Sequence, residues 1–137
     1  MSADNKALIR RYFDAIDSGN WAALDELFAP TYVRHDPNTH EGRLGREDVK
    51  RHLQIVYTAA PDLSHTIEDL LAEGDKVAAR LTSRGTQTGN LRGIASTGRQ
   101  FTMTGMDLFR IADGKIEEQW INQDMLGALQ QLGVIPK

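Results

Sequence analysis

One carboxyl group, that of Asp107, lies among apolar residues in the C-terminal third of the chain. The stretch from Phe101 to Asp124 predicts two long strands, because Asp113-Gly114 between two alternating runs is a strong hairpin signal. Side chains alternate faces along a strand, so Asp107 shares its face with a mostly apolar set: Phe101, Met103, Gly105, Phe109 and Ile111. An ionised carboxylate is costly in such surroundings. We therefore expect Asp107 either to be paired or to keep its proton.

The second predicted strand carries further polar candidates. Counting alternate residues puts Ile116, Glu118, Trp120, Asn122 and Asp124 on one face. If that face lines the same pocket as Asp107, the pocket holds an indole, an amide and several carboxyl groups. Converging polar groups in an apolar concavity indicate a binding site. Asp124 alternatively serves only as the N-cap of a last helix.

Three candidates lie in the N-terminal part of the chain. Tyr12 is on the apolar face of a predicted helix, where its hydroxyl needs a partner or simply packs in the core. Asp36 precedes Pro37 at the end of a short extended segment, a position that also favours a plain turn. His35 is adjacent to Asp36 and faces the opposite way on a strand. We expect only one of these two side chains to enter the pocket.

The elements that must position these residues follow from hydrophobic spacing and turn residues. Helices are predicted near the N-terminus, just before Pro30 and over residues 46–59, and a last one over 124–132. Strands are predicted over residues 31–36, 64–72, 76–86 and in the hairpin of 101–124. Helices followed by antiparallel strands indicate an α+β fold, in which a curved sheet wrapped by helices leaves a pocket.

Composition limits the class of protein. A chain of 137 residues fits one domain, residues 1–137, and a net charge of -3 argues against nucleic-acid binding. No apolar run is long enough to span a bilayer, and MSADNKALIRR lacks the apolar region of a secretory signal, so we expect a cytoplasmic protein. There is no cysteine, and the histidines show no metal-binding spacing: His35, His40, His52 and His65. We expect neither a metal nor another cofactor.

Several segments resemble the SnoaL-like polyketide (ester) cyclases of the NTF2-like superfamily. They include NKALIRRYFDAIDSGNWAALDELFAPTYVRHDP, GREDVKRHL and, most specifically, the tail DGKIEEQW followed by DMLGALQQLG. The resemblance implies an α+β NTF2-like cone and a homodimer. It also implies ring closure by an intramolecular aldol step that uses an aspartate as acid and base, without a metal or a cofactor. Members of that group carry the aspartate where this chain has Ile121, and a histidine where it has Asp107.

Two other branches of the superfamily give different overlays. Ketosteroid isomerase resembles this chain at Tyr12, Asp36 and Asp107, which would correspond to its hydrogen-bonding tyrosine, its base and its neutral aspartic acid. Epoxide hydrolases of the superfamily share an aspartate near Asp124. They also require an Arg-x-Asp pair, where this chain has Arg80-Leu81-Thr82.

These patterns combine into one hypothesis. The chain is predicted to be an enzyme for a small, mostly apolar carbonyl substrate, polyketide-like or steroid-like, bound by Met103, Phe109, Trp120 and Asn122. Asp36, or else His35 or Asp124, would remove a proton as general base. Asp107, protonated and helped by Tyr12, would donate hydrogen bonds to the enolate oxygen.

Two alternatives belong to other classes. In a non-catalytic module that binds a hydrophobic ligand, Asp107 would be ionised and paired with Arg80 or Arg84. In an epoxide-opening hydrolase, Asp124 would activate water.

Overall fold

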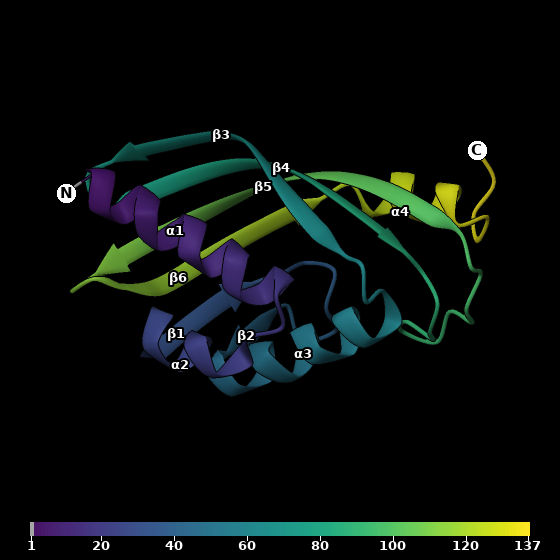
Figure 1. Ribbon diagram of the computed structural model, residues 1–137, viewed down its shortest axis with the longest axis horizontal. Helices are drawn as coiled ribbons and strands as arrows, with labels where there is room; N and C mark the ends of the chain where they lie inside the picture. The colour runs from purple at the N-terminus through teal and green to yellow at the C-terminus, as the bar shows by residue number, and fades with distance from the viewer. Residues whose placement is uncertain (1) are drawn as a thin grey trace.

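One curved sheet forms the back of the molecule, and helices cover its inner face (Figure 1). The computed structural model describes residues 2–137. The six strands lie in the order β2-β1-β6-β5-β4-β3. Their bounds are β1 (Phe28–His35), β2 (Arg43–Gly45), β3 (Ser64–Glu73), β4 (Lys76–Thr86), β5 (Gln100–Ala112) and β6 (Lys115–Gln123). All neighbouring strands pair antiparallel except β1 and β6, which run parallel.

The helices lie on one side of the sheet and at one end of it (Figure 1). They are α1 (Ser2–Asp17), the short 3-10 turn η1 (Trp21–Ala23), α2 (Leu24–Leu27), α3 (Arg46–Ala59) and α4 (Met125–Gln131). Helix α1 buries the residues that its sequence spacing predicted: Leu8, Ile9, Tyr12, Phe13 and Ile16. Within residues 2–137, none of the helices has the length and hydrophobicity needed to cross a membrane.

The predicted α+β class is confirmed, and α3 and β4 have the expected bounds. Three features were not expected. Residues 43–45 of the predicted loop form the edge strand β2, and the sheet contains one parallel pair. Strand β1 also begins at Phe28 and continues through Pro30. This is possible because the pairing of β1 with β6 is irregular between Phe28 and Val33, so the missing N–H of Pro30 falls where the ladder is interrupted.

The β5–β6 hairpin turns as predicted but contains a bulge. Asp113 and Gly114 have φ of 52° and 73°, the positive values that a tight hairpin turn requires. Beyond the turn, Ile116 pairs with Ile111 and Glu118 pairs with Arg110, so one extra residue, Glu117, has no partner on β5. The extra residue reverses the alternation of side chains along the rest of β6.

Because of the bulge, the inward-facing residues of β6 differ from those that the sequence predicted. Register pairs put Gln119 opposite Phe109 and Ile121 opposite Asp107, so Gln119 and Ile121 share the inner face of the sheet. Trp120 and Asn122 therefore lie on the outer face. The expectation that they line the pocket is wrong, because it assumed an unbroken alternation from Ile116.

Candidate active site

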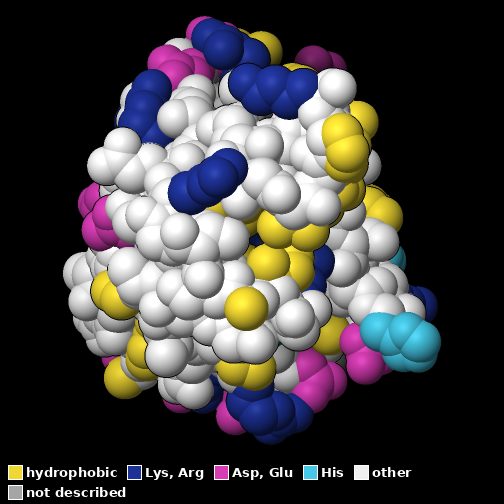
Figure 2. Space-filling view, turned by 90° about the vertical axis from the view of Figure 1, so that its right-hand side faces the viewer, with side chains coloured by type: hydrophobic (Ala, Val, Ile, Leu, Met, Phe, Trp, Pro, Cys, Tyr) yellow, Lys and Arg dark blue, Asp and Glu magenta, His cyan; other side chains and the backbone are white. Residues whose placement is uncertain are grey.

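A cavity lies between the inner face of the sheet and the helices α1, α3 and α4. Its volume is about 120 Å³, roughly ten times the ~10–15 Å³ that one water molecule needs, so it has room for a small organic ligand. Most of its wall is apolar and includes Leu53, Val56, Leu63, Leu81, Phe101 and Met103. Figure 2 shows a hollow on the face at the α4 end of the molecule, with hydrophobic side chains inside it.

Asp107 lines this cavity from β5 and is almost completely buried, with an exposure of 6%. Burial raises the pKa of its carboxyl group to about 6, although the charge of Arg34 and a hydrogen bond from Gln119 act in the opposite direction. That hydrogen bond runs from Nε2 of Gln119 to Oδ2 of Asp107, at 3.1 Å. With a pKa of about 6, Asp107 can both accept and release a proton near neutral pH.

Gln119 connects Asp107 to two tyrosines. Its Oε1 accepts the hydroxyl hydrogen of Tyr32, which fixes the orientation of the amide. Its Nε2 therefore points to Asp107, and also approaches the hydroxyl oxygen of Tyr12 at 3.5 Å. Gln119 has an exposure of 0%, so bulk water does not compete for these bonds. Burial raises the pKa of Tyr12, which keeps its hydroxyl group neutral beside the cavity.

Arg34 brings a buried positive charge to the same region. It lies on β1 next to Gln119 of β6, lines the cavity and has an exposure of 5%. Its Nε and Nη1 have no hydrogen-bond partner. Burial opposes its charge, but nearby Tyr12, Tyr32, Asp107 and Asp36 outweigh burial and raise the pKa of the guanidinium. Buried polar groups without partners are rare in proteins, so Arg34 is a ready donor for an oxygen of a bound ligand.

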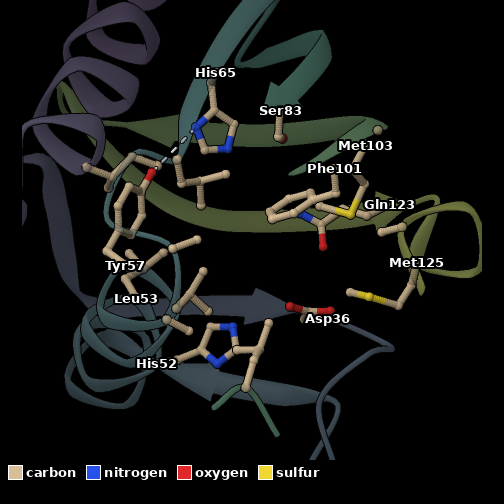
Figure 3. A pocket seen from close by; sticks show the side chains of 18 of the residues that line it. Asp36, His52, Leu53, Tyr57, His65, Ser83, Phe101, Met103, Gln123 and Met125 are labelled. Atoms are coloured by element: carbon tan, nitrogen blue, oxygen red, sulfur yellow. Dashed lines mark hydrogen bonds between the residues drawn. The ribbon is translucent and has the colours of Figure 1, made fainter. Parts of the chain in front are cut away.

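Asp36 and His52 lie on one wall of the cavity, where Figure 3 shows them side by side. Asp36 has an exposure of 2%, and its Oδ1 accepts the backbone N–H of Asn38 at 3.0 Å. Burial and the charges of Arg34 and Arg92 lower the pKa of His52 to about 4. The imidazole of His52 is therefore neutral at neutral pH.

His65 lies on the opposite wall, at the start of β3 (Figure 3). Its Nδ1 is 2.8 Å from Oδ1 of Asp17, the last residue of α1. The same Oδ1 accepts the hydroxyl hydrogen of Tyr57 at 2.7 Å, and Oδ2 accepts the backbone N–H of His65 at 2.8 Å. Two lining residues of the cavity, His65 and Tyr57, are thus held by the carboxylate of Asp17, which itself does not line the cavity.

The structure brings four of the sequence candidates to the cavity wall: Tyr12, Met103 and the carboxyl groups of Asp36 and Asp107. Phe109 is completely buried and packs against Tyr12, with ring centroids 5.6 Å apart. It therefore supports the cavity wall but does not line the cavity.

The other candidates lie elsewhere. His35 is on the outer face, where its ring stacks on Trp120 at a centroid distance of 5.3 Å and its Nε2 is 2.6 Å from Oε2 of Glu118. As expected, only one of His35 and Asp36 enters the cavity. Asp124 is exposed and caps α4 by accepting the N–H of Gly127 at 2.9 Å. Neither Asp124 nor Asn122 is among the lining residues.

The arginine partners considered for Asp107 are also engaged elsewhere. Nε of Arg80 is 2.6 Å from Oδ2 of Asp69, and Arg84 bonds the hydroxyl of Thr66 at 3.4 Å. The arginine whose charge lowers the pKa of Asp107 is instead Arg34. Within residues 2–137, no three His, Asp or Glu side chains converge in a way that could hold a metal ion.

Sequence reasoning missed several polar residues of the cavity region, among them Arg34, His52, His65 and Gln119. A signal for Arg34 was present, because Arg34 and Asp36 are two residues apart on an extended segment and so share a face. Gln119 was missed because the bulge at Glu117 changes the face of the sheet to which its side chain points. His52 and His65 carry no local motif, and only the fold brings them to the same cavity.

Fold and site together define a class of protein: a curved sheet and helices that enclose a mostly apolar cavity with acidic and basic side chains inside. Residues 6–132 match the family described as SnoaL-like polyketide cyclase, and the chain belongs to that family. It is 32% identical over 128 residues to an aklanonic acid methyl ester cyclase from Streptomyces sp. (strain C5), covering 92% of this chain and 80% of the relative.

Solved structures agree with this assignment. TsrD from Streptomyces laurentii has a TM-score of 0.88 and 32% identity, covering 98% of both chains. IdmH from Streptomyces antibioticus, described as a candidate polyketide cyclase, has a TM-score of 0.85 and 34% identity, covering 95% of this chain and 99% of that one.

Proposed function

We propose that this protein is a cyclase that closes a carbon ring in a small, mostly apolar carbonyl compound by acid–base catalysis, without a cofactor. The observation that carries the proposal is the position of Asp107. It is a buried carboxyl group with a pKa of about 6 that lines an apolar cavity near the guanidinium of Arg34, whose Nε and Nη1 have no hydrogen-bond partner. Perturbed carboxyl groups of this kind are concentrated at functional sites.

The reaction proposed is an intramolecular aldol addition. Asp36 accepts a proton from a carbon next to a carbonyl group, and the electron pair of that C–H bond forms an enolate. Arg34, together with Asp107 in its protonated form and the hydroxyl of Tyr12, donates hydrogen bonds to the enolate oxygen. Such donors act most strongly where water is excluded. The enolate carbon then attacks a second carbonyl of the same molecule, whose oxygen takes up a proton and becomes a hydroxyl group.

The substrate class follows from the cavity and from the relatives. The lining is mostly apolar, and its donors suit the oxygens of ketones and esters. Two groups of relatives bear names that specify cyclisation of polyketide methyl esters: aklanonic acid methyl ester and nogalonic acid methyl ester cyclases. We therefore propose a polyketide-like carbonyl compound for this chain, with a steroid-like ketone as the second choice.

The test compares Asp107→Asn and Asp107→Ala with the wild type. Turnover of aklanonic acid methyl ester, nogalonic acid methyl ester and a panel of enolisable cyclic ketones is followed by mass-resolved chromatography. The control is Asp69→Asn, which removes an exposed carboxylate of β3. We expect Asp107→Ala to lose about 10²-fold or more in turnover, Asp107→Asn to lose less because its amide can still donate a hydrogen bond, and the control to keep wild-type rates.

Wild-type turnover in Asp107→Ala would remove Asp107 from the mechanism. Binding of these compounds by the wild-type protein without any turnover would instead favour a module that only holds a hydrophobic ligand.

The proposal also includes a cytoplasmic homodimer of one-domain subunits that pack through the outer face of the sheet. That face carries Leu71 and Met106, with exposures of 68% and 57%. Exposed apolar side chains on a sheet are typical of an interaction surface. Light scattering during size-exclusion chromatography should give a dimer for the wild type and a monomer for Met106→Asp.

A further inference from the structure

The pairing of His65 with Asp17 has a geometry that the proposed chemistry around Asp107 does not use. Asp17 stands at the end of α1, and His65 is the second residue of β3, so two elements far apart in sequence hold them together. The carboxylate of Asp17 accepts three hydrogen bonds: from the hydroxyl of Tyr57, from the backbone N–H of His65 and from the imidazole of His65.

These bonds determine where the proton of the imidazole lies. Burial opposes the ionisation of Asp17, but the hydrogen bonds from His65 and Tyr57 lower the pKa of its carboxyl group below the ordinary value. An ionised carboxylate only accepts hydrogen bonds, so Nδ1 of His65 must carry a hydrogen. The free ring nitrogen is therefore Nε2, and Figure 3 shows it pointing into the cavity, away from the dashed line that marks the contact with Tyr57.

The surroundings of His65 restrict its ring to this orientation. The ring of Phe13 on α1 lies 5.1 Å from the imidazole, measured between centroids, and the side chain of His65 has an exposure of 10%. The titratable groups that face it are Asp17 from α1, Tyr57 from α3 and, more distantly, Asp107 from β5. A carboxylate that fixes the tautomer of an imidazole also stabilises the charged ring after it takes up a proton.

His65 and Asp36 lie on opposite walls of the cavity (Figure 3), so a ligand between them faces a proton carrier on each side. The proposed ring closure needs two such carriers, because one proton leaves a carbon atom and another reaches the oxygen of the second carbonyl. Asp36 serves the first transfer in the proposed function. The second had no assigned donor.

We propose that His65 is a catalytic acid that transfers the proton on its Nε2 to the oxygen of the second carbonyl as the ring closes, and that Asp17 is the residue that positions it. This inference rests on the proposed cyclase function. In the step, the carbonyl carbon gains the bond to the enolate carbon and its oxygen gains the proton. His65 becomes neutral, while Asp36 holds the proton from carbon. Exchange with water at the mouth of the cavity then restores both groups.

The experiment measures kcat and KM for the wild type, His65→Gln and Asp17→Asn, with aklanonic acid methyl ester and nogalonic acid methyl ester as substrates. His40→Gln is the control, since His40 is exposed and outside the cavity. His65→Gln should lose about 10²-fold or more in kcat with little change in KM, because the proposed acid acts only in the reaction step. Asp17→Asn should also lower kcat more than it changes KM, but by less, because the imidazole is kept and only its orientation and tautomer are released.

A His65→Gln variant with wild-type kcat would overturn this inference. If Asp107→Ala is inactive in the same assay, the proposed function stands without His65. A second measurement uses the wild-type protein alone. Nitrogen NMR of its imidazole rings should show the hydrogen on Nδ1 of neutral His65. Hydrogen on Nε2 in the neutral form would also overturn the inference.

Discussion

Asp107 lines the cavity, and Asp17 lies behind its wall, bonded to the lining residues His65 and Tyr57. The surroundings of these two carboxyl groups shift their pKa values in opposite directions. Burial raises the pKa of Asp107 to about 6, while hydrogen bonds lower the pKa of Asp17 in spite of its burial. Asp107 receives one hydrogen bond, from the neutral amide of Gln119. Asp17 receives three and retains more contact with water, its side chain being 22% exposed.

The difference shows that the supply of donors, more than the residue type, decides what a carboxyl group can do. A carboxylate with several donors stays ionised and can only orient its neighbours. A carboxyl group with few donors in an apolar site holds its proton more strongly and can exchange it near neutral pH. A carboxyl group in the cavity wall can therefore carry protons, while one behind the wall positions its neighbours.

Replacing Arg34 should have the largest effect on the difference between the pKa values of Asp107 and Asp17. Arg34 is the strongest influence that lowers the pKa of Asp107, so Arg34→Met should raise that pKa above 6. The variant also lacks the donor proposed for the enolate oxygen, and turnover should fall about 10²- to 10³-fold. Carbon NMR titration of Asp107 and the cyclisation assay check both effects. Arg34→Lys is the matched control, expected to keep the pKa close to 6 and part of the turnover. An unchanged titration of Asp107 in Arg34→Met would contradict the assigned electrostatics.

A smaller effect is expected on the stability of Asp107→Asn. The pKa of Asp107 is raised on folding from 3.8 to about 6, so the folded state binds more protons between these values and wild-type stability falls as the pH rises through this window. The shift corresponds to a free energy on the order of 3 kcal/mol. Urea unfolding at several pH values measures the difference in stability between the wild type and Asp107→Asn, because groups such as His52 titrate in both proteins. Relative to Asp107→Asn, the wild type should lose stability between pH 4 and 6, and a relative gain over this range would contradict the assigned shift.

For Asp17, the predicted dependence of stability on pH has the opposite sign, and Asp17→Asn tests it. Because the folded-state pKa of Asp17 is lowered, its contribution to stability is present above the unfolded value of 3.8 and is lost as the pH falls through the folded value. At neutral pH the variant leaves donors of Tyr57 and His65 poorly satisfied, which should lower the free energy of unfolding by about 1–3 kcal/mol, towards the lower end because the site is partly exposed. Thermal unfolding measures the loss. A fully stable variant would show that the three hydrogen bonds do not contribute.

The smallest effect is expected for His35→Ala on the outer face. His35 contacts Glu118 and Trp120 and does not line the cavity, so turnover should be unchanged and stability should fall by less than about 1 kcal/mol. Cyclisation rates and thermal unfolding check this. A large loss of turnover in His35→Ala, with the fold intact, would mean that chemistry extends beyond the cavity.

The sequence was sufficient to predict the fold class and some of the residues that line the cavity. Periodic apolar residues and strong turn signals located the helices and the hairpin, and one carboxyl group in an apolar row identified Asp107. Counting alternate residues failed beyond Ile116, because nothing in KIEEQW marks Glu117 as an inserted residue. The partnership of Asp17 with His65 was also beyond sequence reasoning, since it depends on where α1 ends relative to the start of β3.

The bulge at Glu117 decides which row of β6 side chains faces the cavity. If Glu117 paired with Arg110 and the alternation ran unbroken from Ile116, then Glu118, Trp120 and Asn122 would face inward in place of Gln119 and Ile121. A change in the position of the bulge along the hairpin would thus replace a whole row of side chains in one step, leaving the architecture intact. A fold with this property can acquire new reactions faster than point substitution alone would allow.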